Sequence, residues 1–199
     1  MSGIIAQNVG RHTGLIKAAA AGGEWTLIQT QTASASSTIS FTSGLDSTYD
    51  EYCFKYINIH PQTNDVAFQF NGSTDSGSNY NVTKTTSAFN AYSHESSGAA
   101  LTYRSGEDMA QGTGFHGIQA DWSSDNDHAG SGMFYLFAPS DTTFVKHFLI
   151  ESSNNHEGEY AMHHFIGGYF NTTSAVDAIQ FKMSSGNIDA GTISLFGIG

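Results

Sequence analysis

The feature of this chain that most constrains its fold is an alternation of apolar and polar residues with a period of two. The alternation is clearest in DVAFQFN, where Val66, Phe68 and Phe70 share one face of an extended chain. Such a pattern predicts a β-strand with one buried face, because successive side chains of a strand point to opposite sides. Comparable patterns predict further strands at EWTLIQT (24–30), STISF (37–41), EYCFKYINI (51–59), GMFYLFA (132–138), TFVKHFLIE (143–151), EYAMHHFIGGYF (159–170), AIQFKM (178–183) and GTISLFGI (191–198).

Polar turn clusters separate these segments, and no segment shows a long amphipathic helical pattern. We therefore predict an all-β fold, an antiparallel β-sandwich that is jelly-roll-like, with a closed barrel as the alternative. The stretch GMFYLFA is apolar throughout, which predicts a central strand covered on both faces. Residues 84–127 are the least regular, and SGEDMAQGTGFHG within them is typical of long loops.

The opening segment differs from the rest in charge. The chain has 7 basic and 18 acidic residues, but residues 1–17 hold two basic residues and no acidic one. We therefore expect an extended N-terminal arm over residues 1–23 and a β-sandwich domain over 24–199. The acidic domain would repel nucleic-acid phosphates, so we expect no nucleic-acid partner. The expected partner-binding residues of the arm are Ile4, Ile5, Arg11, Leu15, Ile16 and Lys17.

Cysteine content and hydropathy exclude several classes of protein. The single Cys53 permits no internal disulfide, so stability must come from packing or assembly. No apolar run approaches the 18 or so residues of a membrane-spanning helix, so we expect no membrane partner. Gln7 and Asn8 interrupt the apolar stretch that starts at Ile4, which argues against a secretory signal, so we expect the protein to be made in a cytoplasm.

The histidine-rich stretch HEGEYAMHH does not fit a zinc site. Two zinc ligands on a helix stand four residues apart, whereas His156 and His163 are seven apart. Adjacent His163 and His164 on a strand point to opposite faces. We therefore expect one buried histidine and others on a surface or a subunit contact.

Calcium-binding and catalytic patterns fail in the same way. The stretch DWSSDNDH offers Asp121, Asp125 and Asp127, but the sixth and twelfth positions of an EF-hand loop are wrong. The sequence still allows a calcium-binding loop of another type. We find no nucleophile elbow and no phosphate-binding glycine loop, and the acidic residues at 107–108 and 157–159 are typical of ordinary loops. We therefore predict no catalytic residue, no metal and no cofactor.

Three stretches carry a resemblance to a known group of proteins: GGEWTLIQTQTASASSTISFTSGLDSTYDEYCFKYINIHP, FNGSTDSGSNYN and the ending GTISLFGIG. Together with the arm they resemble small β-sandwich virion proteins of tailed, especially marine, bacteriophages. The resemblance implies a non-enzymatic structural component of the virion, made in the cytoplasm of the host bacterium. The first hypothesis is a capsid decoration (cement) protein, anchored to the major capsid protein through its arm.

The alternative is a tail or fibre subunit that contacts other tail proteins and binds a host carbohydrate. Loop aromatic residues would then serve as stacking platforms, and the same residues could instead make subunit contacts. An enzyme that depolymerises host polysaccharide lacks support from any motif. An all-β domain without disulfides gains by covering its edges against copies of itself, so we expect a homo-oligomer. The resemblance to virion proteins implies that this oligomer is a trimer. The aromatic candidates are Tyr80, Tyr92, Tyr103 and Trp122.

Overall fold

Twelve antiparallel strands and no helix make up the part of the chain that the computed structural model describes, residues 23–199. No segment of this part is therefore a helix that could cross a membrane. The arm residues Ile4, Ile5, Arg11, Leu15, Ile16 and Lys17 lie outside the described residues. The strands are β1 (Trp25–Thr32), β2 (Ile39–Phe41), β3 (Glu51–Pro61), β4 (Val66–Ser73), β5 (Lys84–His94), β6 (Ala99–Tyr103), β7 (His116–Trp122), β8 (Gly130–Phe137), β9 (Lys146–His156), β10 (Tyr160–Phe170), β11 (Ala178–Met183) and β12 (Ile188–Ile198).

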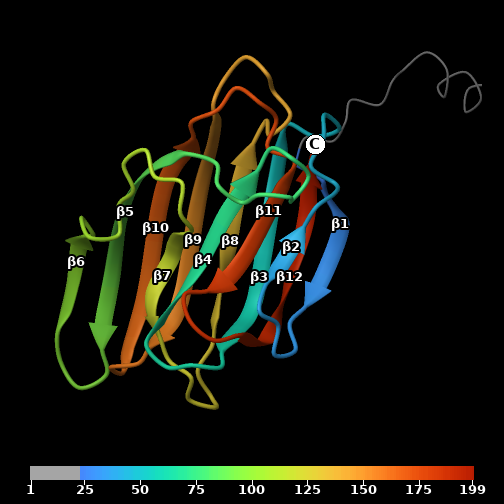
Figure 1. Cartoon of the computed structure of the whole chain (residues 1–199). Coiled ribbons are helices and arrows are strands. Elements are labelled where there is room, and N and C mark those ends of the chain that lie inside the picture. The colour runs from blue at the N-terminus through green and yellow to red at the C-terminus, as the bar shows by residue number, and fades with distance from the viewer. Residues whose placement is uncertain (1–22) are drawn as a thin grey trace, which may run out of the picture.

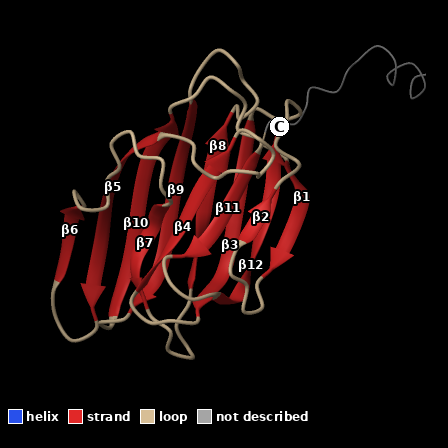
Figure 2. Ribbon diagram, in the orientation of Figure 1, coloured by secondary structure: helices blue, strands red, loops and turns tan. Residues whose placement is uncertain are grey.

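The strands form two layers (Figures 1 and 2). One layer is an eight-stranded sheet in the order β1-β12-β3-β8-β9-β10-β5-β6, and the other is a four-stranded sheet in the order β7-β4-β11-β2. The layers join where Trp122 of β7 pairs with His156 of β9. On the other side Gln31 Nε2 donates a hydrogen bond of 2.5 Å to the carbonyl oxygen of Ser40. The result is a nearly closed, barrel-like sandwich.

The all-β antiparallel prediction is confirmed, and the jelly-roll subclass stays a prediction. The two layers are unequal, with eight and four strands, whereas a jelly roll has two four-stranded sheets in which two Greek keys are wound together.

Aromatic rings from the two layers meet in the core. Phe70 of β4 lies 4.7 Å from Phe134 of β8, measured between ring centroids, and most of these rings meet edge to face. The alternation in DVAFQFN therefore directs its apolar side chains as predicted, with Val66, Phe68 and Phe70 all buried. Buried aromatic surface of this kind supplies most of the free energy that opposes chain entropy.

Residues 84–127, the least regular part of the sequence, contain three strands that the sequence did not predict. β5 and β6 pair as a hairpin, and β7 pairs with β4. β5 gave no signal because its inward face carries polar side chains, including the buried Thr86 and Asn90, so the apolar alternation is absent. Pairing of β5 with β10 along eleven residues forms this strand regardless of its composition. The loop from 104 to 115 is irregular, as predicted.

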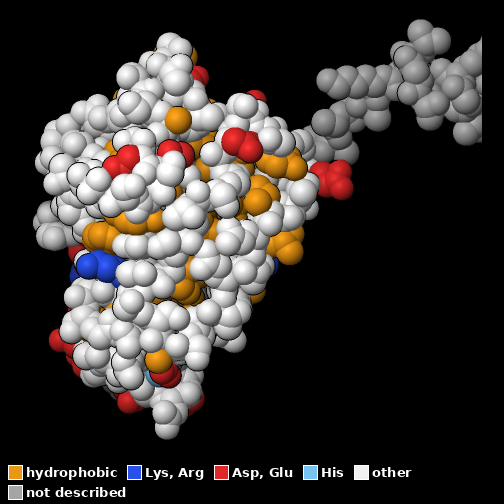
Figure 3. Space-filling model, turned by 45° about the vertical axis from the view of Figure 1, so that its right-hand side comes forward, with side chains coloured by type: hydrophobic (Ala, Val, Ile, Leu, Met, Phe, Trp, Pro, Cys, Tyr) orange, Lys and Arg blue, Asp and Glu red, His pale blue; other side chains and the backbone are white. Residues whose placement is uncertain are grey.

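The prediction that both faces of β8 are covered is correct for one face only. Phe134 and Leu136 point into the core and are fully buried, whereas Met133, Tyr135 and Phe137 on the opposite face are only half-buried. No second layer covers that face among residues 23–199. By contrast, the surface seen in Figure 3 consists mainly of uncharged polar side chains and backbone, with small apolar clusters.

Gly132 of β8 is expected to tolerate no side chain. A Cβ atom there would collide with the carbonyl oxygen of Glu151 and the hydroxyl of Tyr56. Neither neighbour can retreat easily, because both belong to strands inside the large sheet. The substitution Gly132→Ala should therefore lower the free energy of unfolding by about 1–3 kcal/mol, measured by chemical denaturation. Gly114→Ala is the control, since its Cβ would meet nothing within 4 Å; equal effects of the two would contradict the expectation.

Candidate functional site

A polar cleft of about 240 Å³ opens beside the inward face of the large sheet, where the small sheet ends at β7. Strands β5, β9 and β10 supply its floor, and β7 with the loop after β6 supplies its rim. Its side chains come from five separate segments of the chain. They are Asn90, Tyr92, Arg104, Asp121, His156, Tyr160 and Met162.

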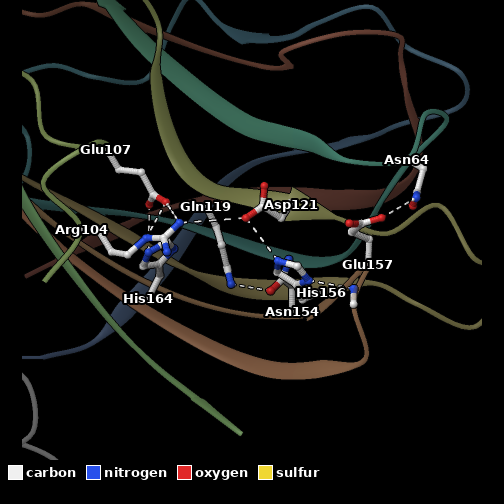
Figure 4. Close-up of polar contacts among 10 residues, drawn as sticks. Asn64, Arg104, Glu107, Gln119, Asp121, Asn154, His156, Glu157 and His164 are labelled. Atoms are coloured by element: carbon white, nitrogen blue, oxygen red, sulfur yellow. Dashed lines mark hydrogen bonds and ion pairs between the residues drawn. The ribbon is translucent and has the colours of Figure 1, made fainter. Parts of the chain in front are cut away.

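Arg104 stands on the rim, held by a pair of contacts to Glu107 (Figure 4). Its Nε donates a hydrogen bond of 2.7 Å to Glu107 Oε1, and a terminal nitrogen contacts the same oxygen. The other oxygen of Glu107 lies 3.0 Å from Nε2 of the fully buried His164. Although burial opposes ionisation, contacts with His164 and Arg104 together lower the pKa of Glu107. Glu107 is therefore an ionised carboxylate, and it holds the guanidinium of Arg104 in position.

Asp121 forms the opposite side of the rim. Its carboxylate lies 3.2 Å from His156 Nε2 and 4.0 Å from a guanidinium nitrogen of Arg104. The backbone of Asp121 has a φ of 59°, a left-handed conformation that is uncommon for a residue other than glycine. His156 is held from its other nitrogen, because Nδ1 accepts a hydrogen bond of 2.8 Å from the amide of Gly158. The ring and the carboxylate are thus both fixed in position.

Two tyrosines and a buried amide complete the cleft. The rings of Tyr92 and Tyr160 meet at 90° with centroids 5.4 Å apart, and His156 packs edge to face on Tyr160. Asn90 is 1% exposed, and its Oδ1 has no hydrogen-bond partner among the described residues. The cleft therefore combines aromatic surface, fixed donors and acceptors, and one unsatisfied buried acceptor.

Within residues 23–199, the cleft contains no thiol and no aliphatic hydroxyl group. No serine, threonine or cysteine lies among the residues that line it. The one thiol of the chain, Cys53, is on a strand outside the cleft, and burial raises its pKa to about 12. A thiol that stays protonated is neither a good nucleophile nor a good metal ligand.

A second cluster brings together Asp125, His128 and Glu159, whose ligand atoms lie within 4.8 Å of one another. Two carboxylates and an imidazole are a set that a divalent cation accepts. Both carboxylates are exposed, however, and exposed acidic groups commonly cluster without an ion. The structure thus separates Asp125 from Asp121, which the sequence suggested as joint calcium ligands, and places Asp121 in the cleft instead.

A different kind of surface covers the outer face of the eight-stranded sheet, the face turned away from the core. Of the eight large hydrophobic side chains that are exposed among residues 23–199, seven lie on strands of this sheet and alternate outward. Leu149, on the central strand β9, is 54% exposed. We call these seven residues the outer apolar face: Trp25, Leu27, Ile57, Phe89, Leu101, Tyr103 and Leu149.

A groove of about 410 Å³ runs through the outer apolar face. It exists because Gly167 and Ser87 have small side chains and stand in register with each other, between taller neighbours. Phe89 and Phe165 stack along one side, with centroids 4.9 Å apart, and Leu149 stands on the other. Charged side chains that the strands of the large sheet direct outward include Glu51, Lys55 and Glu151, and the exposed Asp189 of β12 lies beside His60.

The four aromatic residues predicted to bind a glycan or a subunit have different environments. Tyr92 lines the cleft, and Tyr103 is exposed on edge strand β6 with its hydroxyl bonded to Asp108. Tyr80 is a half-buried loop residue, and its hydroxyl is buried without a partner. Trp122 is 1% exposed and packs on Phe68, so the expectation of a loop contact was wrong for this residue. The sequence placed Trp122 in a loop because it did not predict strand β7.

The histidines follow the expectation from strand geometry. His164 is fully buried on the inward face of β10, whereas its neighbour His163 points to the outer face and lies 2.8 Å from Glu151. His156 and Asp121 each stood out in the sequence, but as candidates for unrelated metal sites. The sequence did not suggest the other four cleft residues, because they carry no motif and only the fold brings them together. They are Asn90, Arg104, Tyr160 and Met162.

Comparison of the chain with protein-family models, with curated proteins and with solved structures found no match.

Proposed function

We propose that this chain is a non-enzymatic structural subunit of a bacteriophage virion, a capsid decoration protein that packs against copies of itself through the outer apolar face. The observation that carries the assembly role is the concentration of exposed hydrophobic side chains on one side of the large sheet. Monomeric soluble proteins rarely expose a contiguous apolar area of this kind without a partner. The virion setting rests on the resemblance of the strand segments and the ending, and the arm over residues 1–23 would anchor the subunit to the shell.

Charge favours a second copy as the occupant of the outer apolar face. The chain has a net charge of −11, so two copies repel each other over most of their surfaces. Beside the outer apolar face, the carboxylates of Glu51 and Glu151 are accompanied by Lys55, and Glu151 also lies 2.8 Å from His163. It is the side on which two acidic copies can approach at the lowest electrostatic cost. Uncovered edge strands β1 and β6 at its two borders favour association further.

The test is a charge introduced in the middle of the outer apolar face. The substitution Leu149→Glu should convert an oligomer, expected to be a trimer, into monomers, because a buried unpaired carboxylate costs several kcal/mol. Sedimentation at tens of micromolar protein measures the change. Phe144→Glu is the matched control, because Phe144 is 70% exposed but lies outside the large sheet, in the segment before β9.

Two results would contradict the proposal. The first is a wild-type protein that stays monomeric under these conditions. The second is a Leu149→Glu variant that associates as well as the Phe144→Glu control. The virion setting is tested separately, by quantifying the copies of the protein in purified particles. A copy number that scales with the capsid supports a decoration protein, whereas a few copies per particle would indicate a tail component.

A further inference from the structure

We propose that the polar cleft lined by Tyr92, Arg104, Asp121 and Tyr160 is a binding site for a neutral carbohydrate, and that it recognises a single pyranose ring. This inference goes beyond assembly and does not rest on it, because the cleft opens beside the inward side of the large sheet, opposite the outer apolar face. Both properties can therefore exist in one subunit, and either can fail without the other.

The first argument is that the polar groups of the cleft are held in place before any ligand arrives. Glu107 fixes Arg104, and His156 lies 3.2 Å from the carboxylate of Asp121. The backbone of Asp121 is left-handed, a conformation that aspartate tolerates, and its carboxylate faces both His156 and Arg104. A preorganised site loses little side-chain entropy on binding.

The second argument is an unsatisfied hydrogen-bonding capacity at the floor. Asn90 is 1% exposed and lines the cleft, yet its Oδ1 has no partner among the described residues. Behind it, Gln119 and Asn154 bond to each other but leave Gln119 Oε1 and Asn154 Nδ2 without partners. Buried polar groups are rarely left unpaired, because each one costs free energy. Oδ1 itself is buried, so a ligand hydroxyl can donate to it once the Asn90 amide turns toward the cleft, whereas an apolar ligand cannot.

The third argument concerns charge and excludes other classes of ligand. Arg104 carries one positive charge, and Glu107 and Asp121 carry two negative charges within one connected group. An anionic ligand would meet a net negative site. A metal cation would meet the Arg104 guanidinium 4.0 Å from the Asp121 carboxylate, which already contacts His156. Neither ion is favoured, whereas a neutral polyol can donate to Asp121 and accept from Arg104 at once.

Aromatic surface and size complete the match to a sugar. Sugar rings have apolar C–H faces, and the perpendicular rings of Tyr92 and Tyr160 offer surface for such a face. The volume of about 240 Å³ equals the share of roughly eight water molecules in the liquid. That space suits one pyranose ring with its hydroxyls. A longer glycan would extend out of the cleft past the loop after β6.

The experiment uses the full chain and neutral methyl pyranosides as probes, namely those of glucose, galactose, mannose and N-acetylglucosamine. Saturation-transfer NMR detects binding, and calorimetry gives Kd. At least one probe should bind, and Asp121→Asn should weaken it by about tenfold or more, because a charge-assisted hydrogen bond is lost. Asparagine is chosen because it tolerates the left-handed backbone. The matched control is Asp127→Asn, since the side chain of Asp127 is 91% exposed and lies outside the cleft.

A second variant keeps the test valid if Asp121→Asn does not fold. Tyr92→Ala removes aromatic surface at a half-buried position and should also abolish detectable binding. Glucuronate and N-acetylneuraminate, as anionic probes, should bind more weakly than the neutral ones. The proposal is overturned if no neutral pyranoside binds, if the Asp121 and Asp127 variants bind alike, or if the anionic sugars bind more tightly. None of these results changes the sedimentation of the protein, so failure here is distinguishable from failure of the assembly role.

Discussion

Replacing Phe134 by alanine is expected to lower the free energy of unfolding by about 3–5 kcal/mol. Phe134 is fully buried on β8, and its ring lies between the two layers. The substitution removes apolar area from the core and leaves a cavity that neighbouring strands of a packed sheet cannot close. Ring centroids within 6.3 Å of Phe134 belong to Phe54, Phe70, Phe148 and Phe181.

The loss is large against the total, because small domains are stable by only about 5–15 kcal/mol. Urea denaturation followed by tyrosine and tryptophan fluorescence measures it. Phe144→Ala is the matched control, since the same change at a 70% exposed ring should stay within about 0.5 kcal/mol. If the two variants lost equal stability, the two-layer core described for Phe134 would be wrong.

The sequence predicts nine of the strands for a simple physical reason. Each of those segments places apolar side chains in the core, and strand alternation then follows from burial on one face. In β9 the outcome is nearly perfect, because buried and exposed residues alternate from Lys146 to Asn155. Where the inward face is polar, as in β5, the same geometry leaves no hydropathy signal. Such strands exist because their backbone pairs with neighbours, and the pattern of one chain does not reveal this pairing.

The candidate site was less predictable than the fold. Asp121 and His156 were visible as chemically capable residues, but their spacing suggested metals instead of a shared cleft. Thirty-five positions separate them, and the bridge of β7 to β9 brings their side chains to 3.2 Å. The sequence did not predict the outer apolar face, for a related reason. Apolar residues of β8 predicted cover on both faces, and residues 23–199 supply that cover on only one.

The buried Lys84 of β5 gives the second large effect. It is fully buried, and Nζ donates hydrogen bonds to Asn71 Oδ1 at 2.8 Å, to the carbonyl of Gly114 at 2.6 Å and to the carbonyl of Val82 at 3.2 Å. No carboxylate is among these partners. Burial therefore lowers the pKa of Lys84 to about 8. The amine ties two loops to β4 at the cost of holding a charge away from water.

The sign of the pH effect follows from the two pKa values. In the unfolded chain the pKa of a lysine is about 10.4, so between pH 8 and that value the unfolded state binds more protons than the folded state. The contribution of Lys84 to stability therefore rises through this window and is fully present above it. Below pH 8 both states carry the proton, and the folded state bears the whole penalty. The difference is about 3 kcal/mol, at 1.36 kcal/mol for each unit of pKa.

The measurement compares the wild type with Lys84→Met between pH 7.5 and pH 10.5. The difference in free energy of unfolding should shift by about 3 kcal/mol in favour of the wild type as pH rises. Burial lowers the pKa of His116 to about 4, so this neighbouring histidine stays neutral throughout and does not contribute. The same comparison with the exposed Lys55 separates burial from the general effect of removing a lysine. A difference independent of pH would mean that water reaches Lys84, and that the amine does not bind the two loops in a dry interior.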